Sequence, residues 1–85
     1  MDPPGGGEEP AGNTLVVTGL HPKARLFDIE YLFGRFGRIL RVEIGFPHPV
    51  DMALVRYENS EGAKDAMDHL VDEKILGQLI SIRYY

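Results

Sequence analysis

The chain has 85 residues, 44% of them hydrophobic, and a formal net charge of -4 at pH 7, which leaves room for one small domain. It has no cysteine, which excludes disulfide frameworks and thiolate metal sites, and no apolar run as long as a membrane-spanning helix. The acidic balance argues against holding nucleic acid by bulk electrostatics, but it is compatible with a local patch of arginines.

The first twelve residues differ in composition from the rest of the chain. They contain three prolines, four glycines and three acidic residues, and almost no large apolar side chain. Such a segment cannot bury enough apolar surface to offset its loss of conformational entropy. We therefore expect residues 1–12 to be a disordered leader, with an acidic interaction arm as the alternative, and residues 13–85 to form the domain.

The ordered part is expected to begin with a strand from Thr14 to Thr18. Side chains alternate between the two faces of a strand. Leu15 and Val17 would then face the core, and Val16 and Thr18 would face the other side. The glycine and proline that follow favour a loop.

Apolar residues at helical spacing predict a first helix from Leu26 to Phe36. Acidic residues in its early turns are favourable to the helix dipole, and Gly37 is a suitable end. Ala24 occupies the expected cap position, for which alanine is a poor residue. Phe27 and Tyr31 lie off the apolar stripe. They either pack against neighbouring loops or contact a partner protein.

Two strands are expected in the middle of the chain. The stretch from Ile39 to Ile44 would place its aliphatic residues on the core and Arg41 and Glu43 on the opposite face. The stretch from Val50 to Tyr57 alternates more regularly. Its core face would carry Ala53, Val55 and Tyr57, and its outer face Met52, Leu54 and Arg56.

A second helix and a last strand complete the expected order. Asn59 is a good helix N-cap, and apolar residues at helical spacing follow it up to Leu70. A strand from Gln78 to Tyr84 would point Ile80, Ile82 and Tyr84 inward and Ser81, Arg83 and Tyr85 outward. The order β-α-β-β-α-β predicts an α+β, ferredoxin-like fold. Its four-stranded antiparallel sheet has two helices on one face and leaves the other face for a ligand.

At this point the chain resembles the RNA recognition motif family over about residues 13–85. The stretches from Leu15 to Leu20 and from Val50 to Tyr57 occupy the places of the family's two strand motifs. Supporting stretches are Asp28 to Phe33, Phe36-Gly37-Arg38-Ile39 and Ala63 to Ala66. The tight link between the second and third strands, and the entry into the second helix at Tyr57-Glu58-Asn59-Ser60, look most like those of the SR-type splicing factors. The resemblance implies single-stranded RNA as the partner, splicing or messenger-ribonucleoprotein proteins as further partners, and a nuclear location, with shuttling to the cytoplasm left open.

The strand motifs depart from the family pattern at the positions that stack on bases. Met52 and Leu54 replace two exposed aromatics in the third strand, and Val16 replaces one in the first. A base stacked on an aromatic ring contributes roughly 1–3 kcal/mol. The resemblance therefore implies RNA binding of modest affinity, and a sheet face that contacts protein is the alternative.

The candidate RNA-binding residues come from all four expected strands. They are Val16, Thr18, Arg41, Met52, Leu54, Arg56, Arg83 and Tyr85. The protein-contact alternative rests on Phe27 and Tyr31 or on the apolar part of the sheet face. No catalytic motif is present, and the three histidines are scattered, so we expect no enzyme activity, metal, cofactor or membrane contact.

Overall fold

The computed structural model describes residues 12–45 and 47–85, so nearly all of the leader expected at residues 1–12 lies outside the described residues. The predicted order of helices and strands is confirmed, with one additional short hairpin before the last strand. In chain order the elements are β2 (Thr14–Thr18), α1 (Leu26–Phe33), β3 (Ile39–Ile44), β4 (Ala53–Tyr57), α2 (Ser60–His69), β5 (Lys74–Ile75), β6 (Gln78–Leu79) and β7 (Ser81–Tyr84).

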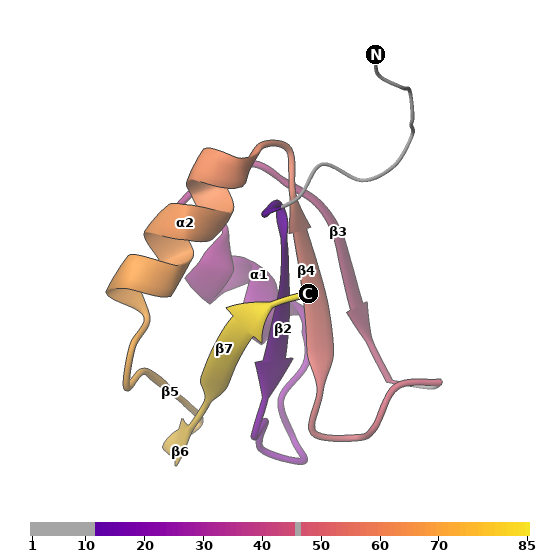
Figure 1. Cartoon of the computed structure of the whole chain (residues 1–85). Coiled ribbons are helices and arrows are strands. Elements are labelled where there is room, and N and C mark those ends of the chain that lie inside the picture. The colour runs from indigo at the N-terminus through magenta and orange to yellow at the C-terminus, as the bar shows by residue number, and fades with distance from the viewer. Residues whose placement is uncertain (1–11, 46) are drawn as a thin grey trace.

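The four long strands form one antiparallel sheet in the order β3-β4-β2-β7, and Figure 1 shows them side by side. The core lies between this sheet and the two helices, and it contains residues of β2, β4, α1 and α2. The opposite face, called the outer face below, carries no helix of the described part of the chain. Within those same residues, no helix is long and apolar enough to cross a membrane.

A β-bulge in β3 explains how its aliphatic residues reach the core. Ile39 and Val42 are an odd number of residues apart, so a regular strand would send them to opposite faces. The register of β3 with β4 shifts between Ile39 and Arg41. The extra residue is Leu40, which is 53% exposed. As a result Ile39, Val42 and Ile44 all pack on the core.

The third strand begins later than predicted. We expected a strand from Val50, but β4 starts at Ala53. A turn precedes it, in which the Met52 N–H donates to the Pro49 carbonyl at 3.1 Å, and Val50 is 84% exposed. These backbone groups bond within the turn and not across the sheet, so pairing with β3 cannot start earlier.

The last strand is interrupted at Ile80, where we expected an unbroken strand from Gln78 to Tyr84. The backbone N–H of Ile80 donates to the carbonyl of Glu73 at 3.1 Å. Glu73 immediately precedes β5, so this bond closes the β5–β6 hairpin and not the main sheet. Ile80 itself is buried in the core. The chain therefore leaves the short hairpin at Ile80 and joins the main sheet only from Ser81, where β7 pairs with β2.

Helix α1 is shorter than predicted at its C-terminal end. It stops at Phe33, and Gly34 rather than Gly37 is its C-cap. Phe36 lies beyond the helix and stacks on the ring of His69 of α2, with 5.5 Å between ring centroids. At the N-terminal end the cap is Arg25, one residue after the expected Ala24. The Arg25 N–H donates to the carboxylate of Asp28 at 2.8 Å.

The ring of Tyr57 is enclosed by two glycines and hydrogen-bonded to α1. A Cβ at Gly62 would lie 2.7 Å from the ring, and one at Gly37 would lie 3.3 Å from it. The Tyr57 hydroxyl donates to the Phe33 carbonyl at 2.6 Å. Burial raises the pKa of the Tyr57 phenol well above its ordinary value of 10.0. Gly37 therefore serves as a packing site for Tyr57 and not as a helix end.

Replacing Tyr57 by phenylalanine should lower the free energy of unfolding by about 1 kcal/mol, because one buried hydrogen bond is lost while the ring still fills its site. Urea denaturation followed by circular dichroism would measure this change. Tyr31 offers a matched control, since it is 77% exposed. Tyr31→Phe should change the stability by less than about 0.5 kcal/mol. Equal effects of the two substitutions would contradict the role given to the Tyr57 hydroxyl.

Candidate nucleic-acid interface

The register of the sheet arranges the outer face in rows that run across the strands. In the middle row, Leu54 of β4 lies opposite Glu43 of β3 on one side and Val16 of β2 on the other. Val16 lies in turn opposite Arg83 of β7. An acidic residue, two apolar residues and an arginine therefore lie side by side across all four strands.

A second row contains the other two arginines of the face. Arg56 of β4 lies opposite both Arg41 of β3 and Thr14 of β2. Tyr85 continues this row beyond the end of β7, because its N–H donates to the Thr14 carbonyl at 3.0 Å. Alternation places the Tyr85 ring on the same face as Arg83, and the residue is 79% exposed. Within residues 12–45 and 47–85, it is the aromatic side chain that the outer face offers to a ligand.

The third row lies nearer the loops. Thr18 of β2 pairs with Ser81 of β7, and Met52 is the residue that precedes β4. Thr18 and Met52 are both partly buried. The eight candidate RNA-binding residues therefore lie on the outer strand positions or at the ends of the strands, as the alternation predicted.

Val16 differs from the prediction in its exposure. We expected it to form an exposed apolar patch with Met52 and Leu54, but it is 1% exposed. Val16 is also absent from the core cluster, in agreement with its place on the outer face. It is a short side chain on a central strand, between the longer Leu54 and Arg83. Such neighbours shield it, so the accessible apolar surface is that of Leu54 and Met52, which are partly buried themselves.

Tyr84 also differs from the prediction, which placed it in the core. It lies opposite Leu15 and therefore on the helix side of the sheet, yet it is 43% exposed. The strand β7 is at the edge of the sheet and pairs only with β2. An edge position leaves one side of the ring uncovered.

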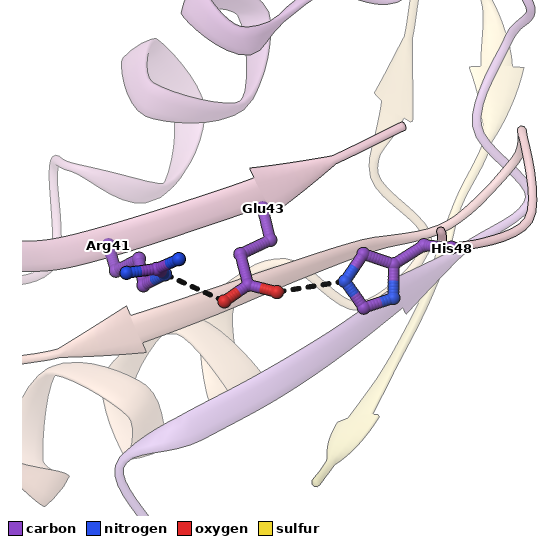
Figure 2. Close-up of polar contacts among 3 residues, drawn as sticks. All are labelled: Arg41, Glu43 and His48. Carbon is purple, nitrogen blue, oxygen red and sulfur yellow. Dashed lines mark hydrogen bonds and ion pairs between the residues drawn. The ribbon is translucent and has the colours of Figure 1, made fainter. Parts of the chain in front are cut away.

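Glu43 is held between two side chains on the β3 edge of the face, as Figure 2 shows. The Arg41 Nε–H donates to Glu43 Oε2 at 2.7 Å. His48 Nε2 lies 2.8 Å from Glu43 Oε1, and since an ionised carboxylate can only accept, the ring N–H is the donor. The His48 bond, followed by the Arg41 bond, lowers the pKa of the Glu43 carboxyl below its ordinary value of 4.5.

This arrangement changes the electrostatics of the arginines. Arg41 and Arg56 are like charges on directly opposed positions, which by itself destabilises a sheet. The carboxylate of Glu43 offsets the charge of Arg41 in part. Three arginines against one glutamate still make the outer face positive in a chain whose net charge is negative.

His48 was not among the residues that the sequence indicated. It lies in the loop between β3 and β4, five residues after Glu43, and no strand or helix spacing connects the two. The backbone N–H of His48 donates to the Gly45 carbonyl at 2.8 Å, which brings His48 back toward the end of β3. The flanking prolines at positions 47 and 49 were the only sequence signal that this loop is conformationally restricted.

A separate surface lies on the helix side of the molecule. Phe27 and Tyr31 of α1 are 65% and 77% exposed, so they do not pack under neighbouring loops. They line a groove of about 490 Å³ together with residues of the β5–β6 hairpin, including Leu76. Leu76 has a φ of 53° and is 54% exposed. This left-handed conformation costs a residue such as leucine roughly 1–2 kcal/mol.

Comparison with known proteins agrees with these observations. A family model described as RNA recognition motif matches residues 15–81. A solved structure described as "Pes4 RRM3 Structure" superposes with a TM-score of 0.78, at 19% sequence identity. The match covers 86% of this chain and 90% of that one. At this level of identity the solved structure supports the fold, and the family model supports the family.

The Glu43 contacts lead to a prediction about pH. The carboxyl should titrate below pH 4.5, and His48→Ala should move its pKa toward 4.5 more than Arg41→Ala does, because the His48 bond is the larger cause. Since the folded pKa is lowered, the stabilisation from this contact is fully present above pH 4.5 and is lost as the pH falls through the folded value. An NMR titration of the side-chain carboxyl would measure this. A carboxyl that titrates identically in the wild type and both variants would contradict the contacts.

Proposed function

The chain belongs to the RNA recognition motif family, whose general activity is RNA binding, and from this premise we propose that its outer face binds single-stranded RNA. The supporting observation is the placement of Arg41, Arg56 and Arg83 on one face of a net-negative chain. Arginine contacts phosphates, and its planar guanidinium also stacks on bases. The RNA would lie across the four strands, with the arginines along its path.

The three arginines do not contribute equally in this proposal. Arg56 is on a central strand, and Arg83 is exposed on β7, so both face the path of the RNA. Arg41 already donates to Glu43 through Nε, although its terminal nitrogens remain available because its side chain is 68% exposed. We expect the exposed Arg83 to contact phosphate more than Arg41, which Glu43 already engages.

Affinity in this proposal is modest. The places of the usual stacking rings are taken by Val16, which is buried, and by Met52 and Leu54, which are partly buried. Among the described residues, Tyr85 is the one that brings an exposed ring to this face. A missing stacked base removes roughly 1–3 kcal/mol, so charge should supply a large share of the binding free energy.

We also propose a role in pre-mRNA or mRNA processing, and with it a nuclear location. This finer proposal rests on the resemblance of the short loop between β3 and β4 to that of SR-type splicing factors. His48, which lies between two prolines of this loop, contacts Glu43 on the edge of the proposed RNA surface.

The chain supplies a matched set of arginines for testing the RNA surface. Of its six arginines, three lie on the outer face, and Arg25, Arg35 and Arg38 lie elsewhere. The triple alanine variant of the outer face should bind a random single-stranded RNA pool far more weakly. Its salt dependence should fall by about 1.4 to 2 in the slope of log K against log[salt], since each single-strand phosphate contact contributes about 0.7 and Arg41 contributes less than a full contact. Fluorescence anisotropy at several salt concentrations would measure both quantities.

The control is the triple variant of Arg25, Arg35 and Arg38, which removes the same charge. It should retain most of the affinity and the salt slope, and Arg56→Ala alone should weaken binding across many sequences. Equal losses in the two triple variants would show that net charge, and not the outer face, governs binding. Unchanged binding in the outer-face triple variant would contradict the proposal.

A second candidate function is contact with a protein in a ribonucleoprotein assembly. The groove beside α1 favours it, because Phe27 and Tyr31 remain exposed there and Leu76 is held in an unfavourable backbone conformation beside them. Backbone strain is often retained where it serves a contact. RNA on the outer face and protein on the helix side are compatible, since the two surfaces use different elements.

Leu76→Asn separates stability from contact at this groove. Asparagine tolerates the left-handed conformation, so the variant should be more stable by about 0.5–1 kcal/mol, as chemical denaturation would show. It should also bind RNA as the wild type does, but recover less of any partner protein from nuclear extract. Leu54→Asp tests the other protein-contact surface, the apolar part of the outer face, in the same recovery experiment. A stabilised Leu76→Asn variant with full partner recovery would remove the groove as a contact site.

A further inference from the structure

The groups in the middle row of the outer face follow one another in an order that complements the parts of a nucleotide. Glu43 offers hydrogen-bond acceptors at one end, the partly buried Leu54 forms the apolar floor beside the buried Val16, and Arg83 supplies a positive charge at the other end. Strands lie about 4.8 Å apart, so the row spans about 14 Å from β3 to β7. This span accommodates a base on the apolar floor and its phosphate beside the arginine.

Glu43 is oriented before any ligand arrives. Each carboxylate oxygen accepts one bond, Oε2 from Arg41 at 2.7 Å and Oε1 from His48 at 2.8 Å. A carboxylate has about four lone-pair positions, so each oxygen keeps capacity for another donor. The Glu43 side chain is 37% exposed, which leaves these positions within reach of a ligand. A group fixed in advance loses little conformational entropy on binding.

The carboxylate also distinguishes between the bases chemically. An ionised carboxylate accepts hydrogen bonds and cannot donate them. Cytosine carries an amino group at the position where uracil carries a carbonyl oxygen. The amino group can donate to Glu43, whereas the carbonyl oxygen would face a negative charge. The lowered pKa of Glu43 keeps it ionised at neutral pH.

We propose that Glu43 is a specificity-determining residue, which accepts a hydrogen bond from the amino group of a base lying on Leu54 and thereby selects cytosine over uracil. Arg41 and His48 act as positioning residues, because they hold the carboxylate and need not touch the base. This inference rests on the proposed RNA binding by the outer face. It adds a preference among bases, which the phosphate contacts of Arg56 and Arg83 cannot provide.

The test compares two pyrimidine oligonucleotides of equal length, oligocytidine and oligouridine, whose rings have the same size and differ at this group and at the neighbouring N3. Fluorescence anisotropy would give the two dissociation constants for the wild type and for Glu43→Gln. The wild type should bind oligocytidine about tenfold more tightly, as one hydrogen bond to a charged acceptor allows. In Glu43→Gln the two affinities should become nearly equal, because the amide can donate as well as accept.

Glu61→Gln is the matched control, since it removes the same charge from an exposed residue of α2, away from the outer face. It should shift both affinities together and leave their ratio unchanged. His48→Ala is a second variant, which removes one of the two bonds that orient the carboxylate. It should reduce the ratio only in part, whereas a merely structural role would lower both affinities equally.

The outcomes separate this inference from the function on which it rests. Binding of both oligonucleotides with equal affinity by the wild type would overturn the role of Glu43 and leave RNA binding intact. A preference for cytosine that survives Glu43→Gln would overturn it as well. Failure of the wild type to bind either oligonucleotide would contradict the proposed RNA binding itself, and the inference would fall with it.

Discussion

The position of β2 between β4 and β7 is the constraint from which the outer face follows. Its pairing places Val16 opposite both Leu54 and Arg83, and Thr14 opposite Arg56. A slip of one residue would send the core residues of β2 to the outer face. Asn13 helps to hold the register through two hydrogen bonds to the backbone of Tyr57. The buried side-chain amide of Asn13 donates to the Tyr57 carbonyl at 3.2 Å, and the backbone carbonyl of Asn13 accepts from the Tyr57 N–H at 2.8 Å.

Tyr57 links this register to the helices. Its backbone meets Asn13 at the start of β2, and its hydroxyl reaches the end of α1 at Phe33. Its ring occupies the space that Gly37 and Gly62 leave open. The Tyr57 side chain, which comes from β4, thus contacts the end of α1, the first turn of α2 and the loop before β3. The outer strand positions beside it can carry polar and charged residues because the core face supplies the stability.

Charge on the outer face is controlled locally by Glu43. The net charge of the chain indicated little affinity for RNA, and the three arginines indicated the opposite. The contacts of Glu43 offset part of the charge of Arg41 and fix a carboxylate beside Leu54, while the outer face as a whole stays positive. In a surface of this kind, RNA binding would depend less on stacking and on total charge than on the position of each charged group.

The sequence by itself determined the order of the two helices and the four main strands, the inward residues of β2 and β4, and the outer placement of the three arginines. These follow from the two-residue period of strands and the helical period of apolar residues, which are local properties. Only the tertiary structure decided the bulge at Leu40, the break at Ile80, the burial of Val16 and the contact between His48 and Glu43. Each of these depends on which residue lies opposite or above another across the sheet, and local spacing does not contain that information.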